Sequence, residues 1–343
     1  MHTLAEWRSF FLSKGIFDDD VIGGLLSYID TLNRNKMPII FDFDHLCLLL
    51  GRSPEYMASA INASEKHWRS FRLPKRSGGY REISVPYPAL LEIQRWIYRN
   101  ILIKIPISPY CHGFVRKKSI LTNTKWHVGK SELLKVDLKD FFPSIGINRV
   151  IHLFRRQGYN PKVSFYLAAL CCLKGKLPQG APTSPYISNL VGRPLDYRMK
   201  CLAKSKSLNY TRYADDIAFS GEKIEKSLIG TVCRIIEDEG FRINEEKIRL
   251  YKGQNRKIVT GICISQRLSL PREYKRTLRQ EIYYIRKYGL ISHIEKRKIK
   301  RTNYCESLLG KFNYWLYVEP ENRYAHTQRE YIKSLILNGF GDY

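Results

Sequence analysis

The stretch Leu208-Asn-Tyr-Thr-Arg-Tyr-Ala-Asp-Asp-Ile-Ala-Phe-Ser220 decides how the rest of this chain is interpreted. Tyr210–Tyr213 and Ile217–Ser220 predict two short strands, with a tight turn over the three residues between them. Asp215 and Asp216 at this turn would both be ionised at neutral pH and would repel one another. A divalent cation removes that conflict, and Mg²⁺ takes carboxylate oxygens together with substrate phosphates. Taken alone, the stretch fits a solvated hairpin tip better.

A third acid in a similar setting favours a metal site. Leu133–Leu138 is an apolar run that predicts a central strand, and Asp137 lies near its end. A charge inside such a run is costly unless it is paired or bound to a metal. A strand-end Asp beside the Asp215–Asp216 pair could hold two metal ions about 4 Å apart for in-line phosphoryl transfer.

Three motifs, in this order and spacing, resemble those of reverse transcriptases. Tyr213-Ala-Asp-Asp216 resembles the catalytic box of that family. Asp137 with Phe141-Phe142 resembles its first palm motif, and Phe141 itself is expected in the core. Leu177-Pro-Gln-Gly-Ala-Pro-Thr-Ser-Pro185 resembles the loop-and-helix motif between the other two.

More narrowly, the chain resembles the bacterial retron reverse transcriptases. Val259-Thr-Gly261 matches their Val-Thr-Gly signature. Asn123-Thr-Lys-Trp-His127 is similar to their Asn-Ala-x-x-His element, with Thr124 at the Ala position. Asn123 and His127 are four residues apart and are expected to share a helix face. The resemblance covers roughly residues 71–265.

The resemblance implies an α+β, right-hand polymerase fold with fingers, palm and helical thumb. The palm would be an antiparallel sheet backed by helices, and it would carry the three acids. The expected bounds are a helical extension over 1–70, fingers over 71–130, palm over 131–265 with interleaved fingers helices at about 147–203, and thumb over 266–343.

The activity implied by the resemblance is RNA-templated extension of a 3′-OH by deoxynucleoside triphosphates (dNTPs), with two Mg²⁺ ions as cofactors. For a retron enzyme, the template and partner would be one dedicated, structured non-coding RNA. Priming would start at a 2′-OH within that RNA and give a branched RNA–DNA product. A separate effector protein is a possible further partner, because retron systems commonly act in anti-phage defence.

Two alternatives stay open at this point. One is a reverse transcriptase of group II intron or diversity-generating type, although the Val259–Gly261 signature favours the retron type. The other is a non-catalytic RNA-binding protein with a polymerase fold. Three retained acids argue against it, because without Mg²⁺ they would repel RNA.

The resemblance also assigns residues to the incoming nucleotide. The stretch 73–86 predicts a hairpin with a Ser-Gly-Gly turn, from which Lys75, Arg76 and Arg81 project. A triphosphate needs cations that close over it, and Arg81 matches the residue that contacts it, whereas Arg76 fits an ordinary surface charge better. Gln179 is placed against the nucleotide, and Gly180 permits close backbone approach.

Two further residues receive roles from the resemblance. Phe142 takes the place of an aromatic gate under the sugar, where a ring would clash with a 2′-OH. Lys247 aligns with a lysine near the leaving pyrophosphate and is a possible general acid. The alternatives are a core phenylalanine and an ordinary surface lysine.

The charge of the chain predicts a polyanionic partner. Its 343 residues carry 58 Lys and Arg against 32 Asp and Glu, a formal net charge of +26, and 13% of them are aromatic. Basic and aromatic residues together suit nucleic acid. The basic residues expected to contact it are Arg95 and Arg99 on an amphipathic helix over 89–105, and Arg276, Arg279, Lys296, Arg297, Lys298, Lys300 and Arg301 in the thumb. The resemblance to reverse transcriptases adds Val259, Thr260 and Gly261, near the primer end.

Two helices are expected from their boundary signals. Ser184 and Pro185 predict the capped start of a helix that runs to about Leu202. Gly51 and Ser53-Pro54 predict the end of one N-terminal helix and the start of the next.

Cysteine usage and the absence of apolar runs bear on location. None of the eight cysteines forms a C-x-x-C pair, and most lie in apolar runs, so we expect buried free thiols in a reducing compartment. The N-terminus shows no signal-peptide pattern, and no apolar run reaches the ~20 residues of a membrane span. The expected location is cytoplasmic, without a membrane partner.

Overall fold

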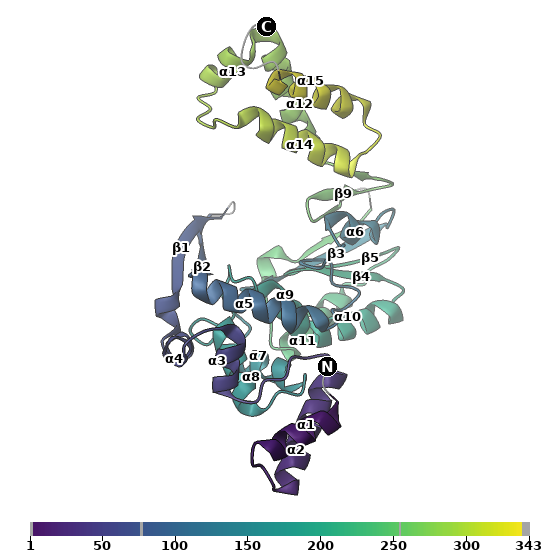
Figure 1. The fold of residues 1–343 in the computed structure, drawn as a ribbon. Coiled ribbons are helices and arrows are strands. Elements are labelled where there is room, and N and C mark those ends of the chain that lie inside the picture. Colours follow the sequence, from purple (N-terminus) through teal and green to yellow (C-terminus); the bar gives the residue numbers. More distant parts are fainter. Residues whose placement is uncertain (1–2, 76–77, 254, 338–343) are drawn as a thin grey trace.

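The centre of the fold is an antiparallel sheet that joins distant parts of the chain. The computed structural model describes residues 3–75, 78–253 and 255–337 (Figure 1). The sheet has the order β4-β5-β3-β6, and β7 also pairs with β3. Its strands are β3 (Glu132–Lys139), β4 (Asn209–Tyr213), β5 (Asp216–Gly221), β6 (Arg242–Ile243) and β7 (Arg249–Tyr251). The predicted antiparallel sheet is therefore present, and β3 lies at its middle.

The two faces of this sheet differ in what covers them. Leu134 and Val136 alternate with Asp137 along β3 and belong to the main hydrophobic core. Helices α10 (Arg193–Ser205) and α11 (Ser227–Asp238) lie on that side (Figure 1). Asp137 shares the opposite face with Leu133, which belongs to a small apolar cluster with Val259 and Ile264. Thr211 and Ser220 are also buried on this face, away from Asp137. The acidic end of β3 is thus left on the less covered face.

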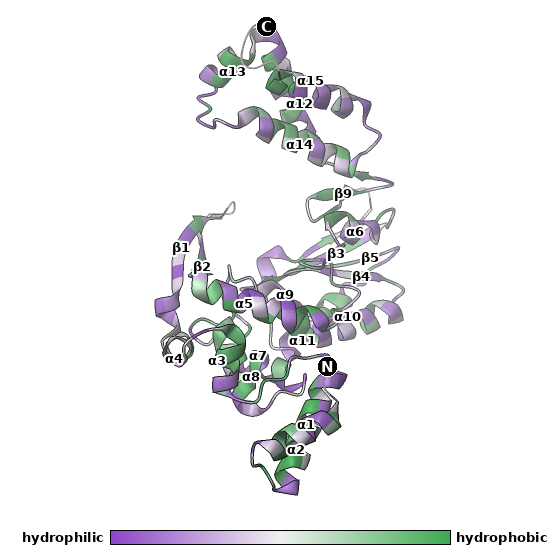
Figure 2. Ribbon diagram, viewed as in Figure 1, coloured by the Kyte–Doolittle hydropathy of each residue, from purple (hydrophilic) through white to green (hydrophobic). Residues whose placement is uncertain are grey.

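The first quarter of the chain forms short helices and a hairpin. These are α1 (Leu4–Ser13), α2 (Asp19–Arg34), α3 (Phe43–Leu50), α4 (Pro54–Asn62), β1 (Trp68–Pro74) and β2 (Tyr80–Pro86). The predicted boundaries near Gly51 are confirmed, since Gly51 has φ +60 and the Ser53 side chain accepts a hydrogen bond from the Tyr56 amide. The hairpin is also confirmed, whereas Arg76 and Ser77 lie outside the described residues. Figure 2 shows β1 as largely hydrophilic, in keeping with its exposure.

The helices between the hairpin and the sheet are α5 (Pro88–Asn100), α6 (Ile120–Lys125), α7 (Ile147–Arg155) and α8 (Pro161–Cys171). On α5, Gln94 is fully buried and donates to the Leu170 carbonyl at 2.8 Å. The expectation that Asn123 and His127 share a helix face needs correction. His127 does not share a helix with Asn123, because α6 ends at Lys125.

The helix predicted from Ser184 to about Leu202 is broken into α9 (Ser184–Val191) and α10. Gly192 separates the two, and a Cβ there would lie 2.9 Å from Nη2 of the buried Arg212. The predicted cap is also wrong, since Thr183 holds the N-cap position and the Ser184 hydroxyl has no partner. Pro194, the second residue of α10, has no amide N–H to continue the hydrogen bonds of α9, which accounts for the interruption.

The C-terminal part forms a separate helical unit. Its helices are α12 (Arg272–Tyr288), α13 (Leu290–Lys296), α14 (Tyr304–Val318) and α15 (Arg323–Leu337). Leu278, Phe312 and Trp315 are buried in a core of their own. The small sheet of β8 (Ile258–Val259), β9 (Ile262–Ile264) and β10 (Leu268–Ser269) stands between this unit and the central sheet (Figure 1).

The structure bears on two expectations, one about the cysteines and one about membrane-spanning helices. All eight cysteines are free, and six of them are buried, so the prediction of mostly buried thiols is confirmed. Within the described ranges, no helix combines the length and apolar character that crossing a membrane requires.

Candidate active site

The three acids meet where β3, β4 and β5 come together. Asp137 on β3 is directly opposite Asp216 on β5, so both side chains lie on the same face of the sheet. Asp215 belongs to the two-residue turn between β4 and β5, and its carbonyl accepts a hydrogen bond from the Leu138 amide at 3.0 Å. Ala214, the other turn residue, has φ +55, which is uncommon for a residue other than glycine.

The acids repel one another in a partly buried setting. Burial, followed by the charges of Asp216 and Asp137, raises the pKa of Asp215 to about 6. The pKa of Asp216 is raised mainly by burial, although Lys135 opposes this shift. Two carboxylates whose charged forms are disfavoured are groups that a nearby cation would stabilise.

Lys247 is the cation that the protein itself supplies. Its Nζ donates to Asp137 Oδ1 at 2.7 Å, and this hydrogen bond raises the pKa of Lys247. Asn244 contacts the same residue twice: its backbone amide donates to the Asp137 backbone carbonyl at 2.9 Å, and its side-chain Nδ2 donates to Asp137 Oδ1 at 3.4 Å. Sequence reasoning did not name Asn244, and a single Asn in a polar stretch gives no signal of this contact.

The oxygen donors of the three acids suit a hard divalent ion, although the protein alone does not supply a complete set of ligands. In the part of the chain that the structure describes, no group of three or more His, Cys, Asp or Glu side chains is arranged so that it could hold a metal ion by itself. The three acids offer carboxylate oxygens, which are the donors that Mg²⁺ prefers. Burial raises the pKa of Asp215 and of Asp216, and a bound cation would oppose that shift. Mg²⁺ typically binds through one or two carboxylates plus substrate phosphates. The residues therefore fit an ion that binds with substrate.

These pKa shifts predict how stability depends on pH and Mg²⁺. Asp215 binds its proton more tightly in the folded state, so the acids lower the stability as the pH rises from about 4 to 6. An ion that binds only the folded state offsets this loss. At pH 7.5, Mg²⁺ is expected to raise the Tm by about 2–4 °C. The increase should be smaller at pH 5, where Asp215 is largely protonated. Thermal unfolding at the two pH values measures both increases in Tm, with NaCl of equal ionic strength as the control. An equal increase at pH 5 and pH 7.5 would contradict the assignment of the Mg²⁺ effect to the charge of Asp215.

The residues predicted to bind nucleotide lie on two adjoining segments. The Ser84 amide of β2 donates to the Gln179 carbonyl at 2.8 Å, which joins the hairpin to the 177–185 loop. Gly180 has φ +127, and a Cβ there would lie 2.6 Å from the Ser84 carbonyl oxygen. The expected close backbone approach at Gly180 is therefore present. Lys75 and Arg81 are exposed on the hairpin.

The two neighbouring phenylalanines that follow β3 differ in burial. Phe141 is only 4% exposed, which confirms its prediction as a core residue. Phe142 is half-buried, with its ring centre 5.5 Å from that of Phe141 and 6.1 Å from that of Phe114. Phe142 therefore keeps part of its ring accessible near the acids.

The Val259–Gly261 signature forms the turn of a tight hairpin between β8 and β9. Thr260 has φ +44 and Gly261 has φ +83. Val259 is 2% exposed and packs with Leu133, so its side chain is not available to nucleic acid. The predicted contact at Val259 is corrected to a packing role, and a contact of this signature would rest on its two turn residues.

The predicted basic residues lie in separate places. Arg95 and Arg99 are exposed on α5. Arg276 and Arg279 line a cleft of about 550 Å³ together with Arg272, Glu273 and Lys275. Lys296, Arg297, Lys298 and Arg301 line a second cleft of about 440 Å³, whose other lining residues are Glu281, His293, Ile299, Tyr304, Ser307 and Lys311. Lys300 belongs to the same segment without lining this cleft.

His127 has a structural place that the sequence did not reveal. It is fully buried, and its two ring nitrogens bond the hydroxyls of Thr211 and Ser220, each at 2.7 Å. Burial lowers the pKa of His127 to about 3, so the ring is neutral. His112 is buried too, and it bonds the Thr122 hydroxyl at 2.9 Å. His127 thus ties the segment after α6 to β4 and β5.

Comparisons with known proteins add to this geometry. Residues 73–304 match the family described as reverse transcriptase (RNA-dependent DNA polymerase). The retron Ec86 reverse transcriptase of Escherichia coli is 35% identical over 265 residues, which cover 75% of this chain and 83% of that protein. This chain belongs to the retron reverse transcriptases. It is accordingly an RNA-directed DNA polymerase, a nucleotidyltransferase of a family that uses divalent metal ions.

Further relatives of this retron reverse transcriptase agree with the assignment. The retron Mx65 reverse transcriptase of Myxococcus xanthus is 34% identical, covering 74% of this chain and 68% of that protein. The solved structure of a foamy viral protease-reverse transcriptase is 15% identical and covers 99% of this chain and 57% of that chain, with a TM-score of 0.43. Family membership and the mixed architecture confirm the predicted α+β right-hand polymerase fold.

Proposed function

We propose that this enzyme copies one dedicated, structured non-coding RNA into DNA, with Asp137, Asp215 and Asp216 as the ligands of two Mg²⁺ ions. The observation that carries the proposal is the register of Asp137 opposite Asp216, with Asp215 on the adjoining turn. When bound, the ions would activate the attacking hydroxyl and stabilise the leaving oxygen. The acids would hold the ions on the less covered face of the sheet, where a primer end would have access.

The other residues would bind and orient the nucleotide. Lys75 and Arg81 would close over the triphosphate from the hairpin, while Gln179 and Gly180 would line the opposite side of the nucleotide. Lys247 is charged and lies beside Asp137, so it can hold a proton near the leaving pyrophosphate. This arrangement is supported by the direct hydrogen bond between the hairpin and the Gln179 loop.

We further propose that the predicted bounds correspond to the functional domains of the polymerase. Residues 71–130 act as fingers, 131–265 as palm and 266–343 as thumb, with the 1–70 helices as an accessory. The two basic clefts on the C-terminal helices would hold RNA and its RNA–DNA product through their phosphates. Arg95, Arg99, Lys300 and the Thr260–Gly261 turn would add contacts to template and primer.

The retron relatives support the identity of the template and product. By analogy with retron systems, priming would start at a 2′-OH of the cognate RNA and give a branched RNA–DNA molecule. A separate effector protein would act with the enzyme in anti-phage defence. These features are proposed for this chain from its family alone.

The decisive experiment is to isolate the enzyme from its host and sequence the nucleic acid that accompanies it. One RNA covalently joined to DNA copied from that RNA is the expected result, and a 2′-5′ debranching enzyme should release the DNA. A mixture of unrelated cellular RNAs without attached DNA would contradict the dedicated-template proposal.

The proposed sugar gate gives a further prediction. Phe142→Ala removes the ring that would clash with a 2′-OH, so ribonucleotide incorporation relative to deoxynucleotide incorporation should rise about 10–10²-fold. Primer extension with single nucleotides of each type measures this ratio. Phe141→Leu is the neighbouring control, since Phe141 is buried and should affect stability without changing the ratio. An unchanged ratio in Phe142→Ala would exclude Phe142 as the gate.

A further inference from the structure

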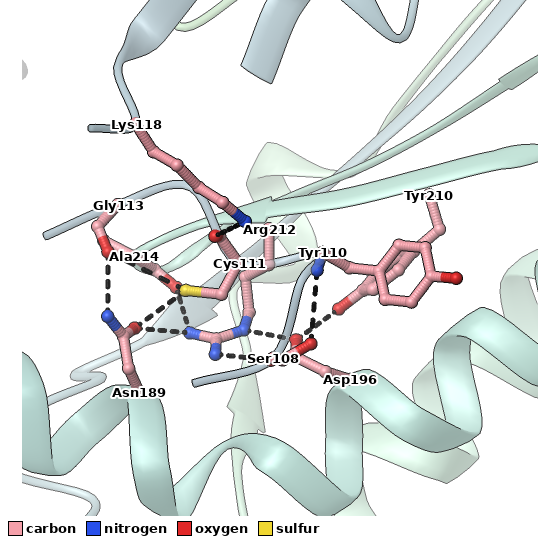
Figure 3. A network of polar contacts seen from close by, with 10 residues as sticks. All are labelled: Ser108, Tyr110, Cys111, Gly113, Lys118, Asn189, Asp196, Tyr210, Arg212 and Ala214. Carbon is pink, nitrogen blue, oxygen red and sulfur yellow. Dashed lines mark hydrogen bonds and ion pairs between the residues drawn. The ribbon is translucent and has the colours of Figure 1, made fainter. Parts of the chain in front are cut away.

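A fully buried ion pair lies directly behind the turn that carries Asp215. Arg212, at the end of β4, donates from Nε and Nη2 to the two carboxylate oxygens of Asp196 on α10, at 2.7 and 2.8 Å (Figure 3). Neither side chain is exposed, and the Tyr210 hydroxyl adds a third hydrogen bond to Asp196 at 2.7 Å. The free-energy cost of removing two charges from water offsets most of the attraction between them, so a gain in folding stability does not by itself explain this buried pair.

The remaining nitrogen of Arg212 reaches the catalytic turn. Its Nη1 donates to the Ala214 carbonyl at 3.0 Å, and Asn189 Oδ1 lies 3.4 Å from the same nitrogen. Ala214 is the residue with φ +55. A non-glycine residue in that conformation persists where its surroundings hold it there. The hydrogen bond from Arg212 restrains Ala214 in this conformation. The guanidinium of Arg212 is itself fixed, because its other nitrogens bond Asp196.

The opposite side of the turn is held by backbone. A Cβ on Gly113 would lie 2.5 Å from the Ala214 amide nitrogen, so the two chain segments are in direct contact. Asn189 on α9 connects both sides, since its Nδ2 donates to the Gly113 carbonyl at 2.8 Å and its Oδ1 accepts from Cys111 Sγ at 3.0 Å (Figure 3). The turn is therefore enclosed between Gly113 and Arg212, with α9 and α10 as the frame.

We propose that Arg212 is a positioning residue that sets the divalent-cation affinity of the three acids by fixing the Ala214–Asp215 turn against α9 and α10. This inference rests on the proposed function, in which Asp215 and Asp216 hold metal ions. The same frame links the acids to the nucleotide loop, because α9 begins directly after the 177–183 segment. Small displacements of the turn would move the carboxylates away from Asp137.

The test is the variant Arg212→Lys, which keeps the charge that Asp196 needs. A lysine ammonium is a single compact donor group and cannot bond both Asp196 oxygens and the Ala214 carbonyl as the guanidinium fork does. The dissociation constant for Mn²⁺, measured by electron paramagnetic resonance without nucleotide, should rise about tenfold. The kcat for primer extension should fall about 10²-fold, with RNA affinity unchanged. A folded Arg212→Lys protein with normal Mn²⁺ affinity would overturn the inference.

Arg198→Lys is the matched control, and Arg198 lies on α10, the helix that carries Asp196. Arg198 pairs with Asp238 and Glu239 at 2.7 and 3.0 Å, away from the turn, and the change should leave Mn²⁺ affinity and kcat as in the wild type. If the wild type binds no Mn²⁺ and makes no DNA, the proposed function itself fails. If the wild type binds Mn²⁺ and makes DNA but Arg212→Lys does both equally well, the positioning role alone fails.

A second variant keeps the inference testable if Arg212→Lys does not fold. The triple change Tyr210→Phe, Arg212→Met and Asp196→Leu replaces the buried polar group with apolar side chains of similar size, which proteins often tolerate. It also removes the hydrogen bond to the Ala214 carbonyl. The same loss of Mn²⁺ affinity is expected, and normal affinity in this folded variant would overturn the proposal.

Discussion

Asp215→Asn is expected to reduce DNA synthesis by about 10³-fold or more, equivalent to about 4 kcal/mol of transition-state stabilisation. The change keeps the size of the side chain and removes one negative charge where Asp137, Asp215 and Asp216 meet. Affinity for RNA should stay within about twofold, because the binding electrostatics come from a chain with a formal net charge of +26. Primer extension and salt-controlled RNA binding, measured on the same preparation, test both parts.

Asp140→Asn is the matched control for this prediction. Asp140 follows β3 directly, is exposed and pairs with Arg242 at 3.3 Å. The same chemical change there should leave synthesis near the wild-type rate, since exposed ion pairs contribute little. Near-normal synthesis by Asp215→Asn would show that the acids do not form the metal site.

Gly180→Ala should lower kcat/KM for dNTPs by about 10–10²-fold, a cost of about 1–3 kcal/mol. Its φ of +127 is a conformation that residues with a side chain rarely adopt, and the new Cβ would lie 2.6 Å from the Ser84 carbonyl oxygen. The contact is with backbone, so it cannot be relieved by a side-chain rotation. The hairpin and the Gln179 loop must then separate, which disturbs the surface proposed to close over the triphosphate.

Gly175→Ala is the control that separates backbone strain from the contact. Gly175 also has a positive φ, +70, but a Cβ there would meet nothing within 4 Å. It should lose some stability and keep its KM for dNTPs. Steady-state kinetics with Tm measurements distinguish the two variants. Equal KM values in both would contradict the role of the Gly180 contact.

The strands and the acid-bearing turn could be predicted because their signals are local. Apolar and β-branched runs around Asp137 and Asp215 have the length and flanks of strands, and the structure places strands there. The break near Gly192 also has a local signal, because Pro194 has no amide N–H to continue a helix. The need for glycine at position 192 could not be predicted in this way, since it depends on Arg212, a residue of another element, occupying the space beside the helix.

The site was predictable to a similar extent. A carboxylate within an apolar run can be recognised as a candidate site residue from the sequence, because burying its charge is costly. A glycine in a loop can likewise be recognised as a place where the backbone can approach closely. Buried polar residues such as His127 and Asp196 do not, because a His or Asp on a helix or turn is usually exposed. Their partners come from strands more than 10 residues away, and only folding brings these groups together.

The most direct test of the account is an anomalous-scattering map from crystals grown with Mn²⁺, a dNTP and a primed RNA template. Two peaks about 4 Å apart are expected, both within coordination distance of oxygens from Asp137, Asp215 or Asp216. A map with Mn²⁺ only elsewhere, and none among these three carboxylates, would contradict the assignment of the catalytic centre.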